Sequence, residues 1–132
     1  MKYGWAVLIV LGSCLISGMA WGHGSALGTL KIQQVDESTF GVLWKRNRAA
    51  VLAEGSALTW SENCQVQGTP QTTYLEAATL ERFQIACSAE GLSGGTIVLP
   101  PEPVGLHALI ETAWKDGTVD HQLLRDEREV LI

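Results

Sequence analysis

Residues 79–87 read TLERFQIAC, and this stretch decides the fold class. Apolar and polar side chains alternate along it, so an extended strand carries Phe83, Ile85 and Cys87 on one face. The side chains between them lie on the other face. No long stripe with helical spacing accompanies it, and short alternating segments recur on both sides, so the sequence predicts a β-rich domain.

Upstream, the alternation predicts a first β-hairpin. Leu30 and Ile32 alternate with polar neighbours and precede the short acidic segment 36–38. The next strand then carries a row of larger apolar side chains on one face, namely Phe40, Val42 and Trp44. The acidic segment is therefore expected to be the turn of the hairpin.

The middle of the chain is less regular. Residues 49–54 (AAVLAE) are compatible with one helical turn or a buried strand, and Gly55 would end either, so a loop or short helix is expected over 46–55. Two short strands are expected at 58–60 and 64–66. The Gly-Thr-Pro sequence at 68–70 is expected to break the chain after them.

Downstream, a short apolar strand at 96–99 is expected to stop at the prolines of 100–103, which cannot donate to a sheet ladder. A last hairpin follows, with strands at 106–114 and 118–125 and an Asp-Gly turn between them. With about seven or eight short strands, the sequence predicts an all-β, antiparallel, sandwich-like domain.

Two further features are assigned to this fold. Trp44, Trp60 and Trp114 stand at strand positions, so we expect core or sheet-face roles, with a ligand platform as the alternative. The run of mixed charge at 125–129 is expected to be a solvated tail beyond the last strand.

The N-terminus resembles a secretory signal peptide. Lys2 supplies the positive charge, and the apolar segment 5–16 follows without any charge. Small residues allow cleavage after Ala20 or after Gly22, and we favour Gly22. This division leaves residues 23–132 as a single domain, which is of ordinary size for one core.

The sequence also allows two other fates of the N-terminus. An uncleaved membrane anchor is disfavoured because glycines and serines interrupt the uncharged stretch 3–22. A lipoprotein would be acylated at Cys14 within 11–14 (LGSC), but this leaves a short apolar region before the cysteine. The chain is therefore expected to be periplasmic or secreted, and not membrane-spanning after cleavage.

The charge of the mature domain argues against a nucleic-acid partner. Fourteen Asp and Glu residues outnumber nine Lys and Arg residues, and Lys2 is the one charged residue of the signal, so residues 23–132 have a formal charge of −6. Such a domain has no electrostatic basis for holding a phosphate backbone. The basic cluster 45–48 (KRNR) is expected to be a solvated strand end or loop.

Cys64 and Cys87 are the two cysteines that remain after the signal is removed. An even pair in an exported protein predicts a disulfide, which would close a loop and stabilise the fold by about 3 kcal/mol. The alternative is a reactive or metal-binding thiol. Neither cysteine has a CxxC partner or a histidine at zinc-ligand spacing, which favours the structural bond.

No catalytic residue is predicted. Residues 91–95 (GLSGG) match the G-x-S-x-G pattern of a nucleophile elbow, but that elbow needs a following helix and a large α/β sheet. Here a short strand is expected to follow. A glycine-rich turn between strands explains the same letters.

His107 and His121 are not expected to share a metal site in either register of the last hairpin. With a two-residue turn, His121 lies opposite Thr112 and the histidines face opposite sides of the sheet. With a one-residue bulge, His121 lies opposite Glu111, about 13 Å along the strand from His107. They are expected to be ordinary surface or half-buried residues.

His23 is the candidate metal ligand. After cleavage at Gly22 its amine and ring nitrogen form a chelate suited to copper. After cleavage at Ala20, the sequence Trp-Gly-His at the new terminus offers a square-planar set of nitrogens for Cu(II) or Ni(II). The alternative is an accidental histidine near a frayed terminus.

A family resemblance rests on several short segments: 30–32 (LKI), 41–45 (GVLWK), Cys64, 83–87 (FQIAC), 91–94 (GLSG), Asp116-Gly117 and 123–125 (LLR). Together they resemble the exported N-terminal region of HupE/UreJ-like membrane proteins, over nearly the whole mature chain. In that family this domain precedes a multi-helix membrane region associated with nickel handling for hydrogenase or urease. This chain stops at Ile132 without such a region, and it is shorter than the family pattern around Gly105.

The resemblance implies an accessory role rather than transport. We therefore expect a non-catalytic binding or accessory domain in a bacterial periplasm or cell envelope, with a membrane protein as its partner. No cofactor is required for this role. The alternative function is a periplasmic copper- or nickel-binding protein that uses His23 at the mature N-terminus.

Overall fold

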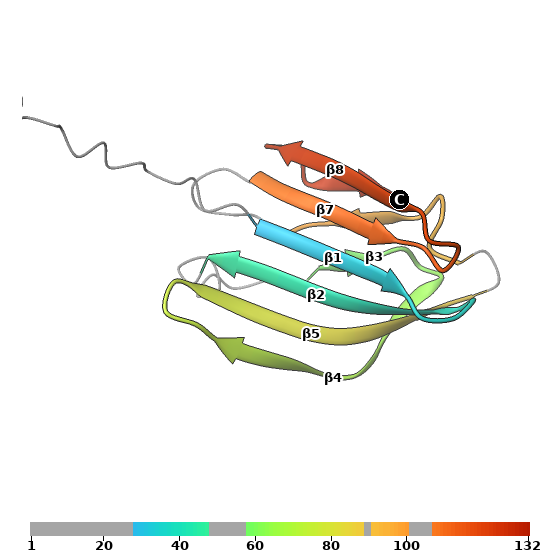
Figure 1. Cartoon of the computed structure of the whole chain (residues 1–132), viewed down its shortest axis with the longest axis horizontal. Coiled ribbons are helices and arrows are strands. Elements are labelled where there is room, and N and C mark those ends of the chain that lie inside the picture. Colours follow the sequence, from blue (N-terminus) through green and yellow to red (C-terminus); the bar gives the residue numbers. More distant parts are fainter. Residues whose placement is uncertain (1–27, 48–57, 89–90, 101–106) are drawn as a thin grey trace, which may run out of the picture.

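The computed structural model describes residues 28–47, 58–88, 91–100 and 107–132. The expected signal peptide, His23 and most of the expected loop or helix at 46–55 lie outside these ranges. The described residues form nine strands and no helix, which confirms the all-β class (Figure 1). They include no helix of the length and apolar character that crossing a membrane requires.

The strands form two sheets that face each other. The larger sheet has the order β4-β5-β2-β1-β7-β8, where the strands are β1 (Gly28–Gln34), β2 (Thr39–Asn47), β4 (Cys64–Tyr74), β5 (Ala78–Cys87), β7 (His107–Ala113) and β8 (Val119–Arg125). The smaller sheet has the order β3-β6-β9, where the strands are β3 (Thr59–Trp60), β6 (Thr96–Val98) and β9 (Glu129–Leu131). Their facing sides share one apolar core, as in a sandwich.

Both predicted hairpins are present. Ile32 pairs with Val42 in the β1–β2 hairpin, so the two alternating patterns bring their apolar faces to the same side of the sheet. Ala113 pairs with Val119 at the closed end of the β7–β8 hairpin. An aspartate organises each turn, because Asp36 and Asp116 accept backbone N–H bonds from residues two positions ahead.

The expected antiparallel pairing is wrong at one place, where β1 pairs with β7 in parallel. Each of these strands is the first strand of a hairpin. The second strands, β2 and β8, pair on the sides of β1 and β7 that face away from each other. The two hairpins therefore meet through their first strands, which run in the same direction (Figure 1). The larger sheet is consequently mixed.

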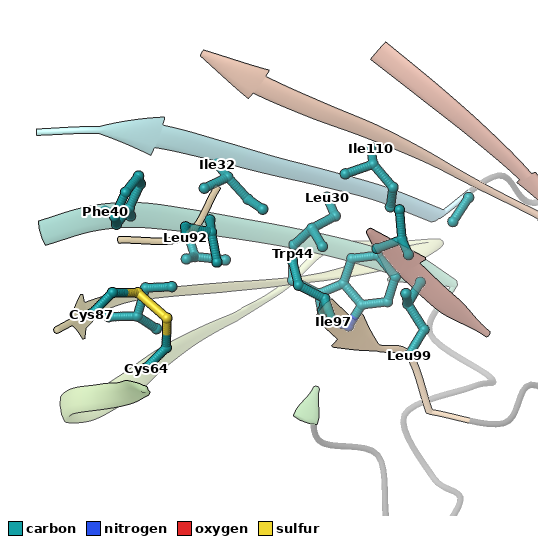
Figure 2. Close-up of a cluster of buried hydrophobic side chains, with 14 of the residues drawn as sticks. Leu30, Ile32, Phe40, Trp44, Cys64, Cys87, Leu92, Ile97, Leu99 and Ile110 are labelled. Carbon is teal, nitrogen blue, oxygen red and sulfur yellow. A yellow bond between two sulfur atoms is a disulfide. The ribbon is translucent and has the colours of Figure 1, made fainter. Parts of the chain in front are cut away.

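Trp44 lies at the centre of the core, and only 1% of its surface is exposed (Figure 2). Leu30 and Ile110 pack on the same side of the larger sheet, and Ile97 and Leu99 come from the opposite layer. Trp60 and Trp114 are half-buried and pack against this cluster. The expectation that the three tryptophans belong to the core or sheet faces is therefore confirmed.

The expected break at 68–70 is wrong, because β4 continues through it as a bulge. Gln67 pairs with Gln84 and Gln71 pairs with Arg82, so three residues of β4 lie opposite one residue of β5. Gly68 adopts a φ of 69° in this bulge. β4 tolerates Pro70 because it is an edge strand and the bulge removes the proline from the ladder.

The expectation of a solvated basic cluster is wrong for Arg46, which lies in β2 and is only 3% exposed. Its Nη2 contacts Glu81 Oε1 at 3.5 Å, and its guanidinium lies 5.8 Å from the centre of the Trp44 ring. The alternation of β2 turns Arg46 inward, and these partners compensate its charge. Lys45 is exposed as expected, and Arg48 lies outside the described residues.

The C-terminal run is not wholly a tail. The backbone turns at Asp126, which has a φ of 68°, and Glu129–Leu131 then form β9 in the smaller sheet. Arg128 Nε donates a hydrogen bond to the Leu99 carbonyl at 3.1 Å. Because Val130 is buried, the chain gains apolar contact by pairing with β6 instead of remaining in solvent.

Candidate functional site

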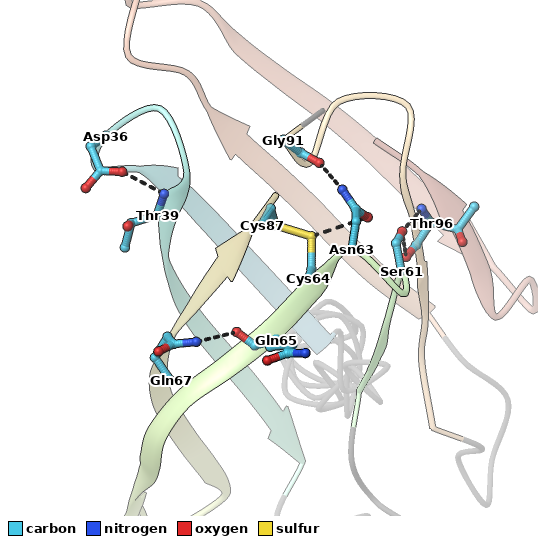
Figure 3. The surroundings of a disulfide bond; sticks show 10 residues. All are labelled: Asp36, Thr39, Ser61, Asn63, Cys64, Gln65, Gln67, Cys87, Gly91 and Thr96. Carbon is cyan, nitrogen blue, oxygen red and sulfur yellow. Dashed lines mark hydrogen bonds between the residues drawn. A yellow bond between two sulfur atoms is a disulfide. The ribbon is translucent and has the colours of Figure 1, made fainter. Parts of the chain in front are cut away.

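The predicted disulfide is present between Cys64 and Cys87 (Figure 3). The two cysteines face each other across β4 and β5, with their Cα atoms 4.0 Å apart, and both are buried. The bond therefore fastens the edge strand to its neighbour at one end. Within this structure it is a structural bond rather than a reactive thiol site.

Polar contacts hold the segment 61–63, which connects β3 to β4 beside the disulfide. Ser61 Oγ accepts a hydrogen bond from the Thr96 N–H at 2.6 Å and donates one to the Thr96 carbonyl at 3.0 Å (Figure 3). Asn63 Nδ2 donates to the Gly91 carbonyl at 2.8 Å. A small pocket of about 220 Å³ lies here, and its Ser61 and Asn63 side chains are engaged in these internal bonds.

The G-x-S-x-G segment is a turn, as expected. Ser93 is exposed, and strand β6 follows instead of the helix that a nucleophile elbow requires. Leu92 is completely buried in the core. The segment therefore connects strands and fastens the turn to the core.

The two histidines of the last hairpin adopt the second of the two registers that the sequence allowed. His121 lies opposite Glu111, and its Nε2 is 3.3 Å from Glu111 Oε2. His107 lies opposite Arg125, four residues away from Glu111 on β7. The register therefore does not bring them together, and among the described residues no three potential metal-ligating side chains cluster.

An open groove of about 610 Å³ lies on the outer face of the six-stranded sheet. It extends over β1, β2, β5 and β4, on the side of the sheet that faces away from the core. Its polar lining includes Lys31, Gln33, Gln67, Gln71, Arg82 and Gln84. Sequence reasoning did not identify this site.

A glycine leaves room in the floor of the groove. Strand pairing places Gln33, Gly41, Gln84 and Gln67 in one row across four strands. Gly41 has no side chain to fill the space between Gln33 and Gln84, and a Cβ there would meet nothing closer than 3.9 Å. The neighbouring amides therefore border an open position, where each can donate and accept hydrogen bonds.

The adjacent row carries the two cations of the groove. It contains Gln71, Arg82, Leu43 and Lys31, in that order across the sheet. Lys31 Nζ contacts Glu111 Oε1 at 3.5 Å on the neighbouring strand β7. Arg82 is exposed and forms no ion pair with a described residue, so its charge is available at the surface.

The bulge in β4 shapes the rim of the groove. Thr69 lies within the bulge and lines the groove together with Gln67 and Gln71 on either side of it. Gln67 Nε2 donates to the Gln65 carbonyl at 3.4 Å (Figure 3). The sequence that was expected to break the strand thus contributes part of the candidate binding surface.

The groove is chemically suited to binding. Its lining offers amide, hydroxyl and cationic groups, and no histidine, cysteine or carboxylate is among the described residues that line it. Such groups form hydrogen bonds and neutralise negative charge. Acid–base catalysis instead needs a side chain that exchanges a proton with the substrate, and nucleophilic catalysis needs one that attacks the substrate. Comparison of the chain with protein-family models and with curated proteins gives no significant match.

Proposed function

We propose that this chain is an exported, non-catalytic binding module of the bacterial cell envelope that attaches to a membrane protein through the groove on its outer sheet face. The observation that carries the proposal is the groove itself, an open surface with amide, hydroxyl and cationic side chains, a gap at Gly41 and no acid–base or nucleophilic pair among its described lining residues. The resemblance of the sequence to the exported region of HupE/UreJ-like membrane proteins motivates the choice of a membrane partner.

Two features support an extracytoplasmic location. The disulfide between Cys64 and Cys87 suits an oxidising compartment, and the first 22 residues have the charge and hydrophobicity pattern of an export signal. The disulfide also holds the edge strand β4 against β5, and both strands line the groove. Oxidation after export would thus complete the binding surface.

Crosslinking in the native host tests the proposal. A photoreactive amino acid at Gln84, in the groove, is expected to form an adduct with an integral membrane protein. The same group at Leu131, which is 64% exposed on the smaller sheet, is the matched control and is expected to form none. Equal adducts from both positions, or no adduct from Gln84, would refute the proposal.

A groove-filling variant sharpens this test. Gly41→Leu places a side chain in the open position without a backbone clash, because the nearest atoms to a new Cβ are 3.9 Å away. We expect it to abolish the Gln84 adduct. Lys45→Leu adds similar bulk at an exposed position of the same strand outside the groove lining, and is expected to leave the adduct unchanged.

A further inference from the structure

The two edges of the six-stranded sheet differ in charge. Strand β8 carries Asp120, His121 and Arg125 within seven residues, and charged side chains of this kind discourage pairing with another strand. Strand β4 carries no charged residue in eleven, and all but Cys64 are exposed. The bulge at 68–70 interrupts β4 but leaves an extended run on each side of it.

The groove beside the β4 edge is cationic in an otherwise acidic protein. The formal charge of the whole chain is −5, yet the charged residues of the groove lining are Lys31 and Arg82. Arg82 lies on β5, next to the edge strand, and is exposed without an ion-pair partner among the described residues. The part of the groove nearest the open β4 edge therefore has a positive charge, and no carboxylate among the described lining residues neutralises it.

We propose that this surface binds an extended acidic segment of a partner polypeptide, which adds as a strand to β4 and directs alternate side chains over the groove. This inference rests on the proposed function and names the chemistry of the partner. An added strand would lie two strand spacings, or about 10 Å, from β5. A glutamate on the added strand and Arg82 both have long side chains, so they can meet above β4 and form an ion pair. Gln71 lies on β4 between them and can donate a further hydrogen bond to the glutamate.

Selection from random peptides tests the ligand class without a known partner. Displayed peptides as long as the eleven residues of β4 are selected on the intact, oxidised protein and counter-selected on its Arg82→Gln variant. We expect enrichment of Asp and Glu at alternate positions. Enrichment of basic or uncharged peptides, or no enrichment at all, would overturn the inference.

Matched charge variants then test the contacts. The selected acidic peptide is expected to bind the Arg82→Gln variant about tenfold more weakly, as the loss of one charge-assisted hydrogen bond implies. Lys45→Gln removes an exposed lysine of the same sheet that does not line the groove, and its affinity is expected to match the wild type. Equal weakening by both substitutions would show only a general charge effect and refute the site.

Amide hydrogen exchange locates the bound peptide. Strand addition is expected to slow exchange of β4 amides and to leave β8 amides unchanged, since only β4 would gain backbone partners. Slowing at β8, or no slowing at β4, would overturn the inference. A membrane protein that crosslinks through Gln84 by a segment without acidic residues would support the proposed function and refute this inference.

Discussion

Two aspartates close the turns of the main hairpins, and both have carboxyl groups whose pKa lies below the ordinary value of 3.8. The Ser38 backbone N–H is the main cause of the lowered pKa of Asp36, to which it donates at 2.9 Å. For Asp116 the main cause of the lowered pKa is the Thr118 hydroxyl, which donates at 2.6 Å. Both groups therefore favour the charged carboxylate in the folded protein.

We predict that these carboxylates contribute to stability at neutral pH and lose that contribution in acid. A folded-state pKa below the unfolded one gives stability that is fully present above the unfolded pKa, near 3.8, and is lost as pH falls through the lower folded pKa. Carboxyl NMR titration should give midpoints below 3.8 for Asp36 and Asp116. Asp36→Asn and Asp116→Asn should reduce the acid-dependent loss, and midpoints at or above 3.8 would contradict the prediction.

A single glycine sets the geometry of the β4 bulge. Gly68 has a φ of 69°, which L side chains rarely adopt, although a Cβ there would meet no atom within 4 Å. We predict that Gly68→Ala lowers the free energy of unfolding by about 1 kcal/mol through backbone strain alone.

Gly41→Ala provides the matched control. Gly41 lies inside a strand, is not among the glycines with positive φ, and has room for a Cβ, so alanine there should not destabilise the protein. Urea unfolding of the two variants measures the difference. Equal stability of both variants would mean that Gly68 is not needed for the bulge.

At the scale of elements, β4 depends on two attachments. Its pairing with β5 supplies a backbone ladder on one side, while its other side is the open edge of the sheet. The disulfide adds a covalent attachment at the end where β4 begins. The strand that forms the rim of the groove is thus fixed at its start and interrupted by the bulge in its middle.

We predict that Cys64→Ala with Cys87→Ala lowers the free energy of unfolding by roughly 2 to 4 kcal/mol, because the bond limits the freedom of the unfolded chain. Denaturant unfolding of the oxidised wild type and the double variant measures the loss. The wild type under reducing conditions is the control and should approach the variant. Two free thiols in protein folded under oxidising conditions would disprove the bond.

At the scale of the whole molecule, the sequence predicts that a signal peptide is removed on export. We predict that the exported protein begins at His23, or at Trp21 as the second choice, and that Cys14 is absent from it. Intact-mass analysis of protein from the periplasm checks the start directly. A species beginning at an acylated Cys14, or one that retains Met1 in the membrane, would overturn this processing.

The new N-terminus also decides between a binding module and a metal-binding protein. We predict that correctly processed protein binds Cu(II) or Ni(II) no more tightly than its His23→Ala variant. Calorimetry must use the authentic terminus, because a leftover Met or tag would remove the chelating amine. Stoichiometric, tight binding that disappears in the variant would make metal binding the primary function.

The sequence by itself determined the two hairpins and strand β5, because alternation of period two and turn-forming aspartates act locally. It also determined the disulfide, since the two cysteines of residues 23–132 have one intramolecular pairing available. It correctly placed Arg82 and Gln84 on the face of β5 opposite Ile85. These conclusions need no knowledge of which strands are neighbours.

Only the tertiary structure decided which strands are neighbours, and the groove depends on that. Gln33, Gly41, Gln84 and Gln67 are scattered along the chain, and they form one row because β1, β2, β5 and β4 lie side by side. Long-range pairing also turned Arg46 toward Glu81 and made the Gly-Thr-Pro segment an edge bulge instead of a break. Periodicity assigns a side chain to a face of its strand, whereas the partners across that face depend on packing of the whole sheet.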